Sequence, residues 1–324
     1  MWKRSFGGRF EKKVCYPAIA LSFKSLGGGI SKEAIYRVSG VSRQAYHQQM
    51  LQSTKVKQRE EAIIDKVIKF RKRHAKMGCR VLFYAIKVAH IGINKFEELL
   101  SSNGLAAKRT RKRIVTTTGL YEDTDVNLIN GLEINNINVV ITGDITYFKL
   151  GAKLFYIFTL KDAYSKRVVG LYGSDTMMAV HAVQTLKQVI RLRNKVKLCN
   201  TIHHTDAGTQ YKSAIYKKVL KNCKIKMSIA ENCLQNGMAE QFNDIVKNHY
   251  LINEKIQSVA QLNKALQKIK KLINEERPVE ALGYKTPVAF EQWIAALTEE
   301  QRPKIKLYDF FKNDKSTKGA LKRH

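Results

Sequence analysis

The 324-residue sequence predicts an α/β protein built on a mixed five-stranded sheet with flanking helices, preceded by an all-α region. Three observations predict this class. Five segments have the apolar content of strands: 137–149, 153–161, 167–173, 199–205 and 225–229. Short turns join the first three, whereas helical patterns precede each of the last two, at 177–193 and about 210–220. A meander followed by alternating helices and strands gives a mixed sheet with helices on its faces.

Composition restricts the class of partner. The chain is 44% hydrophobic, which supports folded cores, and its net charge is +31 from 58 Lys and Arg against 27 Asp and Glu. Such an excess suits a polyanion, most simply nucleic acid. No apolar run approaches about 18 residues and no signal peptide is visible, so we expect a cytoplasmic protein with no membrane partner. The five cysteines form no CxxC pair, which argues against a zinc finger or a disulfide framework.

The N-terminal third is the most basic part, with 26 Lys and Arg against 7 Asp and Glu in residues 1–118. Residues 31–50 predict two short helices, the second capped by Ser42 and ending at Gln49. Residues 80–102 predict a clearer pair, with a helix to His90, a turn at 91–93 and a helix capped by Asn94. Helix, short turn, helix is the helix-turn-helix plan. One such unit is more often a generic hairpin, but two in so basic a segment favour DNA binding.

These patterns divide the chain into five parts. Residues 1–54 are an N-terminal helix-turn-helix region, and 55–118 are a second helical region of the same kind. An Asn-rich linker at 119–136 contains four acidic and no basic residues. Residues 137–252 form the α/β core. Residues 253–324 are a C-terminal region with helices at about 259–276 and 287–297 and a basic tail, which we expect to be frayed from residue 304.

Three acidic residues stand in unusual positions. Asp144 lies inside the apolar run 139–148, and Asp206 ends a short strand before a turn. Asp is depleted in strand interiors and is rarely buried without a partner, for which a divalent cation is the usual choice. Glu240 falls on a predicted helix at 236–250, where it shares a face with Asn236, Asn243, Asp244 and Lys247 and lies opposite an apolar face. Taken alone, Glu240 is better explained by an ordinary amphipathic surface helix with a Glu on its solvent side.

The residues around these acids resemble a known family. The matching motifs are Gly143-Asp144-Ile145-Thr146-Tyr147, His204-Thr205-Asp206-Ala207-Gly208, Glu240 with Lys247 seven residues later, Asp162-Ala163-Tyr164-Ser165-Lys166-Arg167, and Asn274-Glu275-Glu276-Arg277-Pro278. They resemble the DDE transposases of insertion sequences, and in particular the OrfB-type catalytic subunit, whose core is similar to retroviral integrases. Gly40-Val41-Ser42-Arg43 and Gly78-Cys79-Arg80 resemble its two helix-turn-helix regions. The resemblance covers most of residues 30–295, with 33 residues between the second Asp and the Glu.

This resemblance implies a ribonuclease H-like core that binds the ends of a mobile element and catalyses Mg²⁺-dependent DNA cleavage and strand transfer. Asp144, Asp206 and Glu240 are then both the catalytic residues and the ligands of two Mg²⁺ ions, with Mn²⁺ able to substitute. Lys247 holds substrate phosphate. The other expected DNA-binding residues are Arg43, Arg80, Lys95, Lys108, Arg109, Arg111, Lys112 and Arg113.

Two polar residues have competing interpretations. His204 either supports the metal ligands from a second layer or is a packed core histidine, and Asn236 either supports the site or caps its helix. Asp162 matches the family but is expected to tie the turn at Ser165.

The implied partners are double-stranded DNA, as element ends and as target, a homo-oligomer on DNA, and an upstream-frame OrfA-like subunit or fusion. The implied setting is the prokaryotic cytoplasm, on the nucleoid. Two alternatives remain at this level. One is a DNA-binding protein with a catalytically inactive core, against which the intact triad argues. The other is a ribonuclease H-like nuclease that only hydrolyses, against which the helix-turn-helix regions argue.

Overall fold

The computed structural model describes residues 33, 36, 42–107, 126–151, 153–230 and 242–307. The chain forms two compact units, Met1–Lys66 and Val67–His324. Within the described ranges, no helix is both long and apolar enough to span a membrane.

The helix α3 (Arg43–Arg71) contains the border between the two units. Its start is as predicted, because the Ser42 hydroxyl accepts a hydrogen bond from the Ala45 amide at 3.2 Å. Its predicted end at Gln49 is wrong, because residues 50–71 contain neither Gly nor Pro and the helix continues through them. The predicted boundary at 54/55 therefore falls inside a helix. The preceding predicted helix, at 31–38, lies outside the described residues except for Glu33 and Tyr36.

The second helical pair is present as α4 (Cys79–Ala85) and α5 (Ile93–Ser102). Leu82, Phe96 and Leu100 are buried, and the Phe83 ring of α4 meets the Phe96 ring of α5 edge-on, with centroids 5.5 Å apart. Two details differ from the prediction. The first helix ends at Ala85 rather than His90, because Lys87 and His90 both have positive φ, and Gly92 rather than Asn94 is the N-cap of α5.

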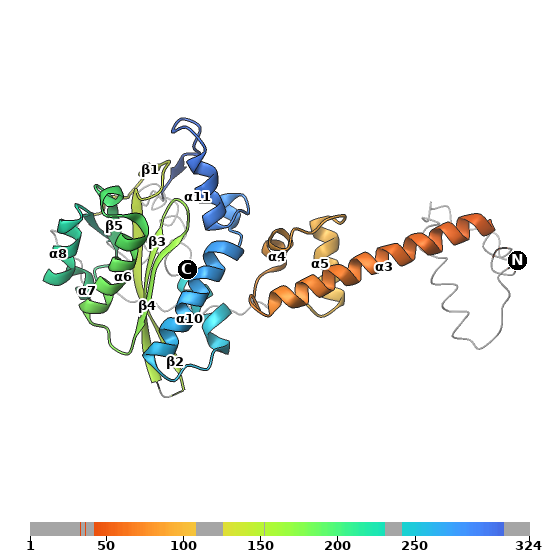
Figure 1. The fold of residues 1–324 in the computed structure, drawn as a ribbon, viewed down its shortest axis with the longest axis horizontal. Helices are drawn as coiled ribbons and strands as arrows, with labels where there is room; N and C mark the ends of the chain where they lie inside the picture. Colours follow the sequence, from red (N-terminus) through yellow and green to blue (C-terminus); the bar gives the residue numbers. More distant parts are fainter. Residues whose placement is uncertain are drawn as a thin grey trace, which may run out of the picture. The chain divides into compact units, whose positions relative to one another are not determined.

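The central sheet has five strands: β2 (Val140–Leu150), β3 (Lys153–Asp162), β4 (Val168–Ser174), β5 (Ile202–Thr205) and β6 (Lys226–Ile229). Their order across the sheet is β4-β3-β2-β5-β6 (Figure 1). The first three form an antiparallel meander, and β5 and β6 extend it in parallel. The predicted ribonuclease H-like mixed five-stranded sheet is therefore confirmed.

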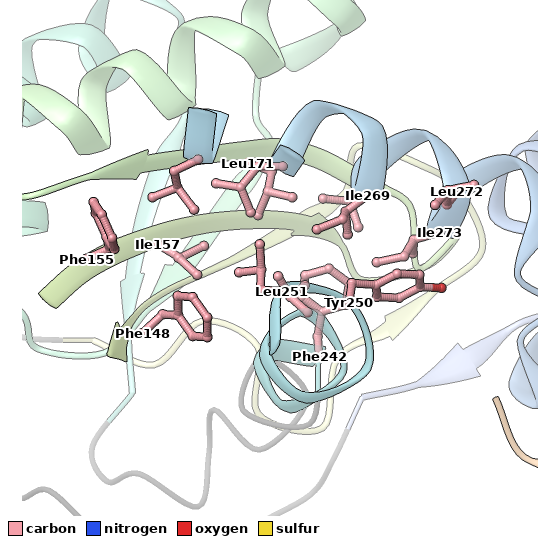
Figure 2. Close-up of a cluster of buried hydrophobic side chains, with 14 of the residues drawn as sticks. Phe148, Phe155, Ile157, Leu171, Phe242, Tyr250, Leu251, Ile269, Leu272 and Ile273 are labelled. Carbon is pink, nitrogen blue, oxygen red and sulfur yellow. The ribbon is translucent and has the colours of Figure 1, made fainter. Parts of the chain in front are cut away.

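Helices cover both faces of this sheet because alternate strand residues are apolar on both sides. On β3, Phe158 and Leu160 pack with α6 (Ala179–Arg193), η1 (Val196–Leu198), α7 (Thr209–Lys212) and α8 (Ala214–Asn222). Phe155 and Ile157 point to the other face, where α10 (Val259–Lys271) and the π-helix η3 (Ile245–Tyr250) lie (Figure 2). The single helix predicted near 210–220 is two helices, because Ser213 interrupts it and caps α8.

The C-terminal helices follow the prediction closely. α10 continues into the π-helix η5 (Leu272–Glu276), and together they fill the predicted 259–276. Short 3₁₀ turns, η4 (Leu251–Asn253) and η6 (Glu280–Leu282), flank this pair, and α11 (Pro287–Ala295) follows with Thr286 as its cap.

The expected linker and tail are partly ordered, which corrects the sequence interpretation. β1 (Glu133–Ile134) pairs antiparallel with β7 (Ile305–Lys306). Ile134 and Leu307 are buried beside Tyr164 and Phe290 of the core, which gives these short strands an apolar anchor. Residues 308–324 lie outside the described part of the chain.

The predicted structural role of Asp162 is confirmed. One carboxylate oxygen accepts hydrogen bonds from the amides of Tyr164 and Ser165, at 3.0 and 2.9 Å. The other oxygen accepts from the Asn138 amide at 2.8 Å. Asp162 thus ties the turn between β3 and β4 to the entry of β2.

Candidate active site

Asp144 and Asp206 lie at the same level on neighbouring parallel strands. Thr142 of β2 is in register with His204 of β5. Asp144 and Asp206 each lie two residues further toward the C-terminus. A step of two residues keeps a side chain on the same face of the sheet. The Asp144 side chain therefore projects toward the face covered by η3 and α10, where Asn243 contacts it, and Asp206 directly follows the carboxyl end of the adjacent strand β5.

The side chain of Asp144 lies where β2 leaves the core. Burial along β2 is complete through Gly143 and becomes partial from Asp144 onward, because β5 ends at Thr205 and no longer covers its flank. A β-carbon at Gly143 would lie 2.9 Å from side-chain carbons of His203, Leu160 and Thr205. Glycine is thus required where three strands pack against the residue that precedes the carboxylate.

Asn243 holds the carboxylate of Asp144. The residue is 3% exposed, and its amide nitrogen donates a hydrogen bond to Asp144 Oδ2. Its amide oxygen accepts a hydrogen bond from Thr159 Oγ1 at 3.2 Å. Thr159 is the cross-strand partner of Asp144, so one asparagine joins both members of the pair to the covering helix. The sequence placed Asn243 on the site-facing side of its helix but gave it no role.

Lys247 lies one helical turn further along the same helix. Its ammonium donates a hydrogen bond to Thr146 Oγ1 at 2.9 Å and lies 5.5 Å from the centre of the exposed Tyr147 ring. Burial lowers the pKa of Lys247, against the opposite influence of the Asp244 and Asp144 carboxylates. The structure therefore brings the predicted phosphate ligand to the strand that carries Asp144. The covering segment is a π-helix over Ile245–Tyr250, where a regular α-helix was expected, and such turns are frequent at functional sites.

The side chain of Asp206 is hydrogen-bonded within the turn that follows β5. Its Oδ1 accepts a hydrogen bond from the Gly208 amide at 3.2 Å, an arrangement that starts α7. Burial raises the pKa of Asp206, and the Gly208 amide opposes that shift. Tyr211 of α7 is buried, and the negative charges of Asp144 and Asp206 add to the effect of burial in raising its pKa. Both carboxylates are therefore close to one phenol, as expected of acids that share a site.

A lysine that sequence reasoning missed lies on the same face. Lys161 is on β3 two residues after Thr159, in register with Thr142, and its ammonium lies 5.2 Å from the centre of the Phe242 ring. Burial lowers the pKa of Lys161 to about 7, and the nearby charge of Lys166 adds to this. A lysine is rare in a strand interior of this kind. The position of Lys161 inside an apolar strand was therefore the signal in the sequence that could have identified it.

The remaining predicted residues have different outcomes. His204 is fully buried, and its Nδ1 makes a hydrogen bond of 2.9 Å with Ser228 Oγ, which suits the packed core histidine. Arg43 and Arg80 are exposed, and Lys95 forms an exposed ion pair with Glu98 at 3.3 Å. The others lie outside the described residues: Glu240, Asn236, Lys108, Arg109, Arg111, Lys112 and Arg113.

The described residues alone do not make a complete metal centre. Among them, no three His, Cys, Asp or Glu side chains come together in a way that could hold an ion, and Glu240 falls in the gap at 231–241. The two carboxylates offer oxygen ligands only, the type that Mg²⁺ prefers. The donor chemistry at this edge of the sheet therefore fits a hard divalent cation.

Comparison with protein families identifies this domain. Residues 135–232 match a family model described as integrase core domain, and residues 221–287 match a second model of the same description. Both matches fall on the five-stranded sheet and the helices that follow it. The chain therefore contains an integrase core domain.

Individual relatives give a consistent result. The chain is 28% identical over 166 residues to a candidate transposase for insertion sequence element IS986/IS6110 of Mycobacterium tuberculosis, which covers 49% of this chain and 59% of that protein. It is 35% identical over 102 residues to transposase InsF for insertion sequence IS3A of Escherichia coli K12, covering 31% of this chain and 35% of that protein. The matched stretch thus spans less than two thirds of either relative. The chain is a distant homologue of insertion-sequence transposases.

Solved structures include the catalytic core domain of HTLV-2 integrase in complex with magnesium. That chain is 19% identical, with a TM-score of 0.39, and the match covers 51% of this chain and 99% of the viral domain.

Proposed function

We propose that this chain is a DDE transposase that binds the ends of a mobile element, cuts DNA there and joins the cut ends to a target. The observation that supports this most is that Asp144 on β2 and Asp206, directly after the adjacent parallel strand β5, follow residues that are in register, with Lys247 bonded to β2 beside Asp144. Homology to insertion-sequence transposases supplies the reaction class.

Glu240 is the proposed third carboxylate. It precedes Asn243 by three residues and Lys247 by seven, spacings that place all three on one side of a helix. Because Asn243 and Lys247 both contact β2, a helical continuation would direct Glu240 to the same edge. Asp144, Asp206 and Glu240 would then hold two Mg²⁺ ions, or Mn²⁺ in their place.

Each polar group has a distinct task in this proposal. Two bound cations would activate the attacking hydroxyl and stabilise the leaving oxygen of an in-line displacement. Asn243 keeps the Asp144 carboxylate in one orientation, which limits the freedom of a metal ligand. Lys247, whose charge is only partly compensated, contacts a DNA phosphate next to the scissile bond.

DNA recognition is assigned to the N-terminal third. We retain the five-part organisation with its borders at 54, 118, 136 and 252, the first border lying within α3. Arg43, Arg80, Lys95 and the basic run at 108–113 contact the phosphates of the element ends. A homo-oligomer would bring two ends together, and an upstream-frame subunit or fusion would complete the assembly.

The test compares Asp144→Asn with wild type on DNA fragments that carry the element ends. Asp144→Asn removes a carboxylate charge while keeping its shape, so cleavage and joining in Mg²⁺ should be lost while end binding persists. Asp175→Asn is the matched control, because Asp175 is an exposed acid outside the site.

The outcomes separate the alternatives. End binding by the wild type without any metal-dependent nicking would favour a DNA-binding protein with an inactive core. Nicking without joining of a supplied pre-cut 3′ end would favour a hydrolytic nuclease. Loss of end binding in a folded Asp144→Asn protein would contradict the assigned role of Asp144.

A further inference from the structure

The helices on the other face of the sheet carry a concentration of positive charge. Residues 176–230 contain eleven Lys and Arg and a single acidic residue, Asp206. Nine of these cations are exposed: Lys187, Arg191, Lys195, Lys197, Lys217, Lys218, Lys221, Lys224 and Lys226. We call these nine residues the basic face.

The cations of the basic face point away from the core. The inner side of α6 is formed by residues such as Leu186 and Val189, and that of α8 by Tyr216 and Leu220, all packed in one cluster against the sheet. Lys187 and Arg191 are four residues apart on the outer side of α6. Lys217, Lys218 and Lys221 occupy the outer side of α8, with spacings of three and four residues. The two helices lie on the same side of the sheet (Figure 1), and their cations are exposed.

None of these nine cations is neutralised within the described part of the chain. No ion pair within 4.0 Å joins any of them to a described acidic side chain. Arg193, on the same helix α6, is the informative contrast. It is buried, and it pairs with Glu291 and with Asp162. Arg193 thus has a structural partner, whereas the basic face leaves its charge available to a ligand.

Helix stability does not account for this arrangement. Cations in the last turn of a helix interact favourably with its dipole, which explains Arg191 and Lys221. Lys187, Lys217 and Lys218 lie outside those turns. Like charges at three- and four-residue spacing weaken a helix, so the α8 lysines carry a small cost that an anionic ligand would relieve.

The basic face extends from the level of the carboxylates to the far end of the sheet. α8 follows α7, which begins directly after the Asp206 turn, and it runs back to the start of β6 at Lys226. Nine helical residues span about 14 Å. A duplex carries one phosphate charge per about 1.7 Å of its axis, so a duplex segment of this length carries about eight phosphates in total.

We propose that the basic face binds the backbone of a second DNA duplex, the target, while the N-terminal third binds the element end. This rests on the proposed function, because strand transfer requires two duplexes at one site. Binding depends on phosphate contacts, so it is independent of sequence and steeply dependent on salt.

The test replaces Lys217, Lys218 and Lys221 together by Gln in the full-length chain. A matched control replaces Lys264, Lys268 and Lys271 of α10 by Gln, which gives the same change in charge on the opposite face of the sheet. Thermal unfolding checks that both variants fold. Fluorescence anisotropy then measures binding to an unrelated duplex of about 30 base pairs between about 0.05 and 0.2 M salt.

The α8 variant should bind the unrelated duplex at least about tenfold more weakly, with a salt slope reduced by up to about 2.7 for three lost phosphate contacts. Cleavage of element ends should be unchanged, whereas joining to target should fall about in step with the loss of duplex affinity. Equal effects of the two variants, or no effect of the α8 variant, would overturn the proposal. So would a parallel loss of end cleavage, which would assign the face to the element end. The binding arm requires no catalysis, so it remains decisive even if the chain neither cuts nor joins DNA.

Discussion

Replacing Asn243 by Ala tests whether the carboxylate of Asp144 needs its buried support. The substitution removes the amide that donates to Asp144 Oδ2 and the oxygen that accepts from Thr159 Oγ1. Both partners remain in place, and Asn243 is too buried for bulk water to replace it freely. Asp144 is then free to rotate about its side-chain bonds.

The size of the effect follows from these contacts. A hydrogen bond to a charged group contributes about 1.5–3 kcal/mol. Since about 1.4 kcal/mol corresponds to a factor of ten, loss of this bond should slow Mg²⁺-dependent cleavage by about 10- to 100-fold. Leaving the Thr159 hydroxyl without its acceptor should also lower the free energy of unfolding by about 1–3 kcal/mol.

The assay is single-turnover cleavage of an end-bearing duplex over a range of Mg²⁺ concentrations. This range separates weaker metal binding, which high Mg²⁺ would rescue, from a slower chemical step. Asn248→Ala is the matched control, because Asn248 lies on the same helix and donates to Asp244 Oδ1 at 2.7 Å. The control should retain activity close to that of the wild type.

Cleavage by Asn243→Ala within about twofold of the wild-type rate at every Mg²⁺ concentration would refute the supporting role of Asn243. An equal loss of activity in Asn248→Ala would also refute it, because the effect would then come from the helix as a whole. Urea denaturation of both variants shows whether a loss of rate merely reflects unfolded protein.

Two further predictions concern stability. Glu291→Ala leaves the mostly buried guanidinium groups of Arg167 and Arg193 without their shared carboxylate. The free energy of unfolding, measured by urea denaturation, should therefore fall by about 3–5 kcal/mol. A loss below about 1 kcal/mol would contradict this expectation. Burial lowers the pKa of His203 from 6.5 to about 4, so between these pH values the unfolded chain binds a proton that the folded chain does not. The free energy of unfolding should therefore decline by about 3 kcal/mol as pH falls from 6.5 toward 4. His203→Gln, which keeps an acceptor for the Tyr216 hydroxyl, should flatten that decline, and an unchanged pH profile would refute it.

The strands were predictable because their signal is local. Short segments rich in apolar or β-branched residues and bounded by turns marked all five strands, and the observed ends differ from the expected ones by a few residues. The pairing of β1 with β7 had no such signal. Each strand has two residues, and their partners lie about 170 positions apart, so only the packing of Ile134 and Leu307 on the core creates them.

The site was predictable in part for the same reason. An aspartate in an apolar strand is anomalous on its own, so Asp144 could be identified from its neighbours. The role of Asn243 depends on facts that no local pattern contains: the register that sets Thr159 opposite Asp144, and the packing of a π-helical segment over that pair. Periodicity placed Asn243 on the correct face, but an exposed asparagine and a buried one have the same periodicity.

Lys247 and the α8 lysines carry their charge in different settings. Gly143 permits His203, Leu160 and Thr205 to close tightly around β2, so β2 and β5 lie in register where the carboxylates emerge. On that face Lys247 is partly buried and hydrogen-bonded to Thr146. On the other face the cations are exposed and unpaired among the described residues. A cation that must meet one phosphate at a reacting bond benefits from being held, whereas cations that bind any duplex benefit from remaining free. The different states of Lys247 and the α8 lysines are therefore expected if Lys247 contacts one phosphate at the reacting bond while the basic face binds the backbone of a second duplex.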